Sequence, residues 1–257
     1  MHGLRQSGFT IFEVAIAMFL LTLLFGTIFM PLQAQIENRK IEQTEELLAR
    51  AREALLGYAA THGYLPCPAD ATGSGHEAAG SDHLAGTCPA YHGFLPAATL
   101  GFTTPGSDGY ASDAWGTAAH RIRYAVSSQT IGPPGNTNAL TRVNGMRAAG
   151  IADLGSSTLS LFHICSGAAG ASASHCGSAG TLASTAPVVI WSGGVNAATG
   201  GDSMDEAQNP NAKGGSADRV FVSRVRSNVP GREFDDLVTW IPMPVLIGRM
   251  VMAGQLP

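Results

Sequence analysis

The N-terminal part of the chain is a long apolar segment. Within "GFTIFEVAIAMFLLTLLFGTIFMP" the only charged side chain is Glu13, and no other follows it until Glu37. About 20 apolar residues suffice to cross the hydrocarbon core of a bilayer as a helix. The pattern therefore predicts a transmembrane helix over residues 9–32. It also leaves Glu13 to be explained, because a charge inside a bilayer is costly and usually functional.

An amphipathic pattern follows over residues 33–61. Such spacing predicts that the helix continues and that one of its faces is covered by the rest of the protein. Gly57 and Gly63 weaken the helical pattern, and Pro66 ends it. The apolar positions with helical spacing are Ile41, Leu48, Ala51, Leu55 and Tyr58.

Beyond Pro66 the pattern changes to short apolar runs between loops rich in Gly, Ser, Asn and Pro. In "HRIRYAV", the apolar residues Ile122, Tyr124 and Val126 alternate with arginines, which is typical of a half-buried strand. The chain should therefore form a globular domain over residues 62–257, in which the helix lies across an antiparallel sheet, and "PVLIGRMVMAGQLP" should form a short helix. Further strands are predicted over residues 158–164, 187–191, 218–226 and 234–241.

The length and the net charge of the chain limit the classes of function that it can have. With 257 residues the chain can bury a sizeable core, and its formal net charge is only −4. A nucleic-acid-binding domain usually carries a basic excess. We therefore expect no nucleic acid among the partners.

The residues before and within the apolar segment resemble a known signal. Gly8-Phe9-Thr10-Ile11-Phe12-Glu13-Val14 is similar to the N-terminal cleavage and methylation signature of type IV prepilins and type II secretion pseudopilins. The short polar stretch that carries Arg5 and ends at Gly8 is similar to the charged leader of these proteins. Phe12 departs from the pattern, since an aliphatic residue is usual there, and the resemblance covers only the start of the chain.

The resemblance implies how the N-terminus is processed and used. A prepilin peptidase would cut after Gly8, so that residues 1–8 are a leader peptide, and would methylate Phe9. Glu13 would act in assembly, where in this family the acid of an incoming subunit meets the N-terminal amine of its neighbour. Gly26 and Pro31 would allow the helix to bend or melt during assembly, and an ordinary proline kink is the alternative.

A second resemblance concerns Asp113-Ala114-Trp115-Gly116, which is similar to the D-x-W-G segment before the first strand of the major type II secretion pseudopilin. Asp113 is expected to cap this turn and Trp115 to pack on the helix, without a catalytic role. The inserts between Pro66 and Ser112 and beyond Arg142 are longer than in a major pseudopilin. The chain therefore resembles a minor or accessory subunit.

Four cysteines lie beyond the predicted transmembrane helix, in Gly-rich loops. An even number of cysteines outside the cytoplasm indicates disulfides, and sequential pairing predicts the bonds Cys67–Cys88 and Cys165–Cys176. A zinc site is the alternative for the second pair, because His163 and His175 lie close to it in the sequence. The adjacent His175 and Cys176 would point to different sides, so we expect no metal and no cofactor.

Together these features predict an α+β, pilin-like fold in which a long membrane-spanning helix packs on an antiparallel sheet with long disulfide-closed loops. The expected function is that of a structural subunit of a type IV pilus or a type II secretion pseudopilus. The protein would cross the bacterial inner membrane once, with its C-terminal domain in the periplasm or in a surface filament. Its partners would be the prepilin peptidase, other pilin or pseudopilin subunits and the inner-membrane assembly platform.

Two other classes of function stay open. The first is a membrane-anchored tip subunit for adhesion or DNA uptake, using a basic strand face or a calcium site. The second is a membrane-anchored periplasmic enzyme, although the sequence contains no G-x-S-x-G, H-E-x-x-H, P-loop or G-x-G-x-x-G motif and Asp235 and Asp236 are adjacent. We therefore expect no enzyme. The basic face would comprise Arg121, Arg123, Arg224 and Arg226, and the calcium ligands would be Asp202, Asp205 and Glu206.

Overall fold

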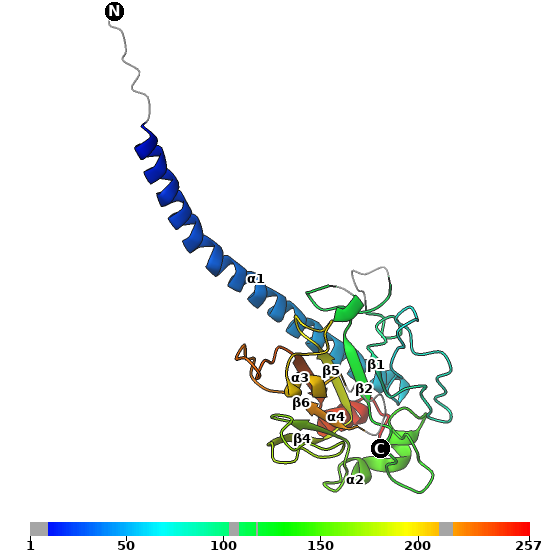
Figure 1. The fold of residues 1–257 in the computed structure, drawn as a ribbon. Coiled ribbons are helices and arrows are strands. Elements are labelled where there is room, and N and C mark those ends of the chain that lie inside the picture. The colour runs from blue at the N-terminus through cyan, green and yellow to red at the C-terminus, as the bar shows by residue number, and fades with distance from the viewer. Residues whose placement is uncertain (1–9, 103–107, 117, 211–217) are drawn as a thin grey trace, which may run out of the picture. The chain divides into compact units, whose positions relative to one another are not determined.

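The structure is a computed structural model that describes residues 10–102, 108–116, 118–210 and 218–257, without the side chains of residues 24–32. It divides into two compact units, Met1–Glu42 and Gln43–Pro257. Helix α1, Ile11–His62, contributes to both units (Figure 1). The compact body therefore begins at Gln43, within the helix.

The prediction of a membrane-spanning helix is wrong for the described part of the chain. There, no helix combines the length and the apolar character that crossing a membrane requires. The described apolar stretch of α1 runs from Ile11 to Leu23, which is shorter than the about 20 residues needed. The predicted pilin-like fold with such a helix, and the predicted single-pass inner-membrane location, are corrected accordingly.

The amphipathic stripe of α1 is confirmed where the helix belongs to the body. Leu48, Ala51 and Leu55 are buried, whereas the flanking Ile41 and Tyr58 are only partly buried. The polar Thr44 lies on the same buried face, where its hydroxyl accepts a hydrogen bond from the Ala114 N–H at 3.2 Å. This bond holds the predicted D-x-W-G turn against the helix.

The first sheet contains four antiparallel strands in the order β1-β2-β5-β7. Strand β5 lies between β2 and β7, and all its residues are buried. On β2, the hydroxyl of the buried Tyr124 donates to the Pro66 carbonyl at 2.9 Å, which ties this face of the sheet to the chain just after α1. The strands are β1 His92–Phe94, β2 Arg123–Val126, β5 Val188–Ser192 and β7 Leu237–Ile241.

A second sheet, absent from the prediction, covers the other face of the first. Its order is β4-β3-β6, with β3 and β4 antiparallel but β3 and β6 parallel, so the prediction of a single antiparallel sheet is also wrong. The apolar runs predicted buried strands, but they carried no information on which strand pairs with which or in what direction. The strands are β3 Phe162–Cys165, β4 Thr181–Ala186 and β6 Val220–Val222.

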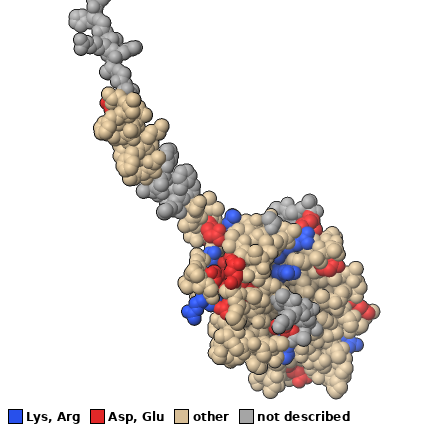
Figure 2. Space-filling model, in the orientation of Figure 1, with Lys and Arg blue, Asp and Glu red and all other residues tan. Residues whose placement is uncertain are grey.

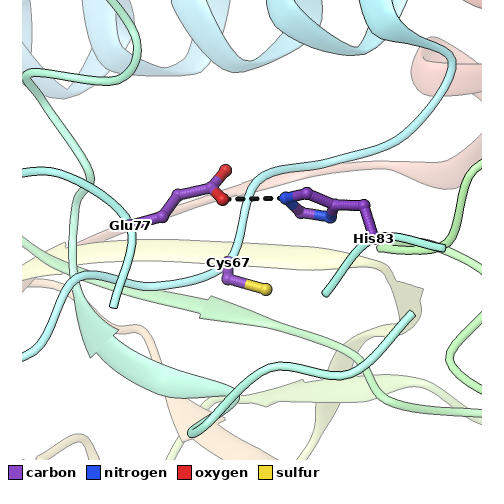
Figure 3. A group of neighbouring side chains, drawn as sticks. All are labelled: Cys67, Glu77 and His83. Carbon is purple, nitrogen blue, oxygen red and sulfur yellow. Dashed lines mark hydrogen bonds and ion pairs between the residues drawn. The ribbon is translucent and has the colours of Figure 1, made fainter. Parts of the chain in front are cut away.

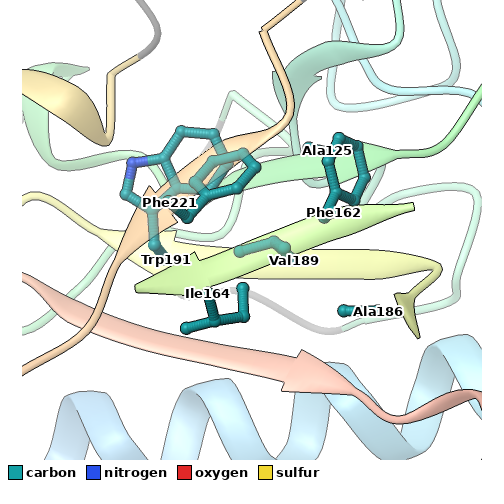
Figure 4. Close-up of a cluster of buried hydrophobic side chains, with 7 residues drawn as sticks. All are labelled: Ala125, Phe162, Ile164, Ala186, Val189, Trp191 and Phe221. Atoms are coloured by element: carbon teal, nitrogen blue, oxygen red, sulfur yellow. The ribbon is translucent and has the colours of Figure 1, made fainter. Parts of the chain in front are cut away.

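The main apolar core between the two sheets is shown in Figure 4. Trp191 of the first sheet contacts Phe221 of the second, with ring centroids 5.1 Å apart, and Phe221 meets Phe162 edge to face at 5.4 Å. This core fixes the two sheets face to face, so the body has α1, the first sheet and the second sheet as successive layers. Its buried members are Ala125, Phe162, Ile164, Ala186, Val189, Trp191 and Phe221.

The remaining helices are short and complete the body. The predicted C-terminal helix is confirmed as α4, which follows the N-cap Pro242 and carries Pro244 in its first turn, a position that proline favours. After α4, the Gln255 side-chain amide donates to the Ala60 and Thr61 carbonyls. These carbonyls lie in the last turn of α1, where a helix has no backbone N–H groups left to pair with them. The helices are η1 Ala118–His120, α2 Gly145–Leu154, α3 Met204–Gln208 and α4 Met243–Met252.

Both predicted disulfides are confirmed. Cys67–Cys88 joins the segment after α1 to the loop before β1, and Cys165–Cys176 joins the end of β3 to the loop before β4. No cysteine in the described chain is free. Each bond closes a loop that contains no helix.

Replacing both Cys67 and Cys88 by Ala should lower the free energy of unfolding by about 2–4 kcal/mol, because the unfolded chain regains the freedom of the open loop. The loss should be smaller for the Cys165→Ala, Cys176→Ala pair, since these residues are 11 apart in sequence and the first two are 21 apart. Urea denaturation followed by circular dichroism measures both. An unchanged midpoint for the first pair would contradict the expectation.

Candidate functional site

The N-terminal end of α1 carries the candidate assembly residue, Glu13. Thr10 precedes the helix, and its backbone N–H and its hydroxyl both donate to Oε2 of Glu13, at 2.9 and 3.0 Å. In return the Glu13 N–H donates to the Thr10 hydroxyl at 3.3 Å. This reciprocal arrangement is a capping box, which satisfies amides that the first turn of a helix leaves unpaired. It explains why an acid stands at this position in an otherwise apolar segment.

The hydrogen bonds with Thr10 also hold the charge on Glu13. The bond from the Thr10 backbone N–H, followed by that from its hydroxyl, lowers the pKa of Glu13 below its ordinary value. Both bonds use Oε2, and no described residue donates to Oε1. Glu13 is therefore an exposed, ionised carboxylate with an oxygen that can accept a further donor.

Apolar side chains surround this end of the helix on all sides. Phe12 is 74% exposed and Phe19 is 66% exposed. A helix that is apolar all round normally has its surface covered. This surface, which we call the apolar N-terminal surface, comprises Ile11, Phe12, Val14, Ile16, Met18, Phe19, Leu20, Leu21 and Leu23.

The structure does not test the roles predicted for the other processing and bending residues. Gly8 and Phe9 lie outside the described residues. Helix α1 continues through Gly26 and Pro31, whose side chains are not described. The cut after Gly8 and the bend at Gly26 and Pro31 therefore stay predictions.

The alternative zinc set does not form a metal site, because Cys165 and Cys176 are bonded to each other. His163 contacts the Ser160 hydroxyl at 3.0 Å, and His175 accepts the Gly177 N–H at 3.3 Å. A different group, Cys67, Glu77 and His83, brings ligand-type atoms together in the described chain (Figure 3). Cys67 belongs to the other disulfide and cannot act as a thiolate ligand there.

His83 and Glu77 form a polar pair that the sequence did not reveal. Nε2 of His83 lies 2.7 Å from Oε2 of Glu77, and Nδ1 lies 2.7 Å from the Thr141 carbonyl oxygen. Burial lowers the pKa of His83, but the hydrogen bonds to Glu77 and Thr141 outweigh it and raise the pKa above its ordinary value. Since both ring nitrogens face acceptors, the charged imidazolium suits this position.

The alternative calcium ligands are occupied by the protein's own donors. The buried Glu206 accepts from the Asp202 N–H, the Asp235 N–H and the Asn196 amide at 2.7, 2.7 and 3.1 Å. Asp205 pairs with Arg224 and accepts the Ala168 N–H. These contacts indicate that Glu206 organises the loop between β5 and β7.

Three of the four arginines of the alternative basic face have interaction partners of their own. Arg121 pairs with Asp108 at 3.0 Å, and Arg224 pairs with Asp205. Arg226 also has an interaction partner. On the face drawn in Figure 2, basic side chains lie among acidic ones on a largely uncharged surface. Arg123 differs from the other three and makes no ion pair in the described chain.

Sequence reasoning placed Asp113 in its turn but missed its distant partners. Its Oδ1 accepts the Trp115 N–H at 3.0 Å, which confirms the predicted cap, while Oδ2 accepts the Ser192 hydroxyl at 2.6 Å. Burial raises the pKa of Asp113, although the bond from Ser192 opposes this. The carboxylate lies between Ser192 and His120, so the imidazole cannot take a proton from Ser192 as in a catalytic triad.

The pair His83–Glu77 predicts a pH-dependent stability. Because the pKa of His83 is raised in the folded protein, its contribution is fully present below the ordinary value of 6.5 and is lost as the pH rises through the folded value. Glu77→Gln should lower the pKa of His83 and reduce this dependence. NMR titration of the imidazole and urea midpoints above and below its pKa measure both effects. Glu46→Gln, on an exposed turn of α1, is the control, and an equal pKa in Glu77→Gln would contradict the assignment.

Comparisons with known proteins neither extend nor replace the resemblance of the N-terminal segment. Neither a family model, nor a curated protein, nor a solved structure matches this chain.

Proposed function

We propose that the chain is a prepilin-like structural subunit that assembles with similar subunits through its N-terminal helix. The filament would be a type IV pilus or a type II secretion pseudopilus. The observation that carries the proposal is the helix end itself, where an ionised acid at the third helical position lies within an apolar N-terminal surface exposed on all sides.

The apolar N-terminal surface calls for a cover made of other helices. Fully burying one Leu, Ile, Val, Phe or Met side chain contributes about 1.5–3 kcal/mol. Several such side chains lie within consecutive turns, so bundling the helices of neighbouring subunits is strongly favoured. The same helix of an adjacent copy offers the matching apolar surface.

Glu13 would give this bundling its register. A cut by prepilin peptidase after Gly8 would place a charged amine on Phe9, and Oε1 of Glu13 on a neighbouring subunit could accept it. Between packed apolar helices the attraction of the two charges is stronger than in water. Leaving either charge buried alone is costly, so subunits in the wrong register would be disfavoured.

We propose no catalytic role for the chain. Asp113 is held by Ser192 and Trp115, and the adjacent Asp235 and Asp236 are held by the Val195 N–H and the Asn209 amide. These contacts support structural roles for the buried acids.

Three substitutions separate the charge of Glu13 from its capping role. Glu13→Gln keeps a side-chain acceptor for the capping box but removes the charge, Glu13→Ala removes both, and Thr10→Ala weakens the cap while keeping the charge. With charge pairing, Glu13→Gln and Glu13→Ala should both assemble poorly, whereas Thr10→Ala should assemble nearly as well as the parent. Filaments sheared from cells that express the chain and a prepilin peptidase are quantified by immunoblot and electron microscopy.

The same blots test the processing step. The three variants above should lose the leader as the parent does, whereas Gly8→Val should remain uncut. Parental assembly of Glu13→Gln together with failure of Glu13→Ala and Thr10→Ala would assign Glu13 to capping alone. Normal processing of Gly8→Val would contradict the prepilin proposal itself.

A further inference from the structure

A cleft of about 280 Å³ opens beside the first sheet. Arg121 and Arg123 form one wall, and the loop over residues 193–201 forms another. Trp191 and Asp236 also line it. All these residues belong to the body, and the cleft is independent of the apolar N-terminal surface.

Arg123 is held in this wall by the sheet. Its neighbours across the strands are Phe94 on β1 and Trp191 on β5, so the three side chains share one face. The Arg123 guanidinium lies over the Phe94 ring, 4.5 Å from its centroid. An arginine stacked on an aromatic ring is oriented in advance, and its outer N–H groups keep their capacity to bind an anion.

No described residue supplies a counter-charge for Arg123. In the described chain its side chain makes neither an ion pair nor a hydrogen bond, and burial lowers its pKa. A partly desolvated cation is costly unless an anion accompanies it. Its neighbour Arg121 differs, because it donates to Asp108 and to the Ala71 carbonyl and lies 3.8 Å over the Tyr110 ring.

Asp236, the only carboxyl group among the described residues that line the cleft, does not supply the missing anion. Asp236 makes no ion pair with Arg123, and its Oδ2 accepts the Asn209 amide at 2.6 Å. Burial, with the charges of Glu206 and Asp235, raises the pKa of Asp236 to about 8 despite that bond. Near neutral pH the group is therefore largely protonated and can itself donate a hydrogen bond.

The rest of the lining is small and weakly polar. It includes Ala119, Ala197, Ala198 and Pro210, and a side chain added at Gly200 would meet nothing within 4 Å. We propose that this cleft binds a small organic anion, whose carboxylate or phosphate group pairs with Arg123 and whose short apolar body lies against the alanines and Trp191. A nucleic acid strand would require a row of unpaired cations, and Arg121 is already engaged by Asp108.

The test is calorimetric titration of the full chain with benzoate, phenyl phosphate and the neutral benzyl alcohol. At least one of the two anions should bind saturably, and the anion that binds more tightly identifies the preferred head group. Benzyl alcohol should bind at least about tenfold more weakly, because it lacks the charge-assisted bonds to Arg123. Arg123→Gln should weaken the binding of the anion by about tenfold or more, and Arg123→Lys should weaken this binding less.

Arg232→Gln, which removes one charge from an exposed loop, is the matched control and should bind as the parent does. Ala198→Trp, at an exposed position of the lining, should block the cleft without altering the core and decides the matter if Arg123→Gln fails to fold. The proposal is overturned if neither anion saturates the parent, if benzyl alcohol binds as tightly as benzoate, or if a folded Arg123→Gln or Ala198→Trp binds like the parent.

Discussion

Strand β5 is buried on both of its faces, and the rest of the body follows from that constraint. Its sequence Val-Val-Ile-Trp-Ser has no exposed position, so apolar layers must cover the first sheet on both sides. The buried stripe of α1 lies on the side where Tyr124 bonds to the Pro66 carbonyl, and the second sheet covers the side of Val189 and Trp191. The helix and the second sheet are therefore both required for the central strand to be stable.

Polar groups lie in the loops that follow the buried strand β5. Beyond β5 the chain turns through Gly194, whose backbone φ of +62° and lack of a side chain allow Asp235 to approach closely. There the buried Glu206 accepts the Asp235 and Asp202 N–H groups, and the buried Asn209 amide donates to the carboxyl group of Asp236. Buried polar groups in low dielectric need such partners, so this network also fixes the loops that frame the cleft.

The two units of the protein differ in how far their apolar side chains are covered. In the body, apolar side chains of the helix and the sheets cover one another. At the start of α1, the apolar side chains from Ile11 to Leu23 are exposed, and the only charge among them is tied into the helix cap. The proposed assembly through this helix and the proposed anion cleft of the body therefore rest on separate features, and either can hold without the other.

The sequence by itself determined the features that depend on neighbouring residues. These are the helix that carries Leu48, Ala51 and Leu55, the apolar cores of several strands and the closing of two short loops by disulfides, because periodicity and short loops are local properties. It overestimated the apolar N-terminal segment as a membrane span, and it did not identify the capping box, although Thr10 and Glu13 have the required spacing.

Only the tertiary structure decided which strands pair and which charges meet. The parallel pairing of β3 and β6 and the bond between Asp113 and Ser192, 79 residues apart, join segments whose patterns say nothing about each other. Arg121 and Arg123 have the same alternation in the sequence and both line the cleft, yet Arg121 pairs with Asp108 and Arg123 has no counter-charge among the described residues. The physical reason is that burial and electrostatic partners are set by residues distant in the chain, whereas the pattern of a strand records only that it is buried.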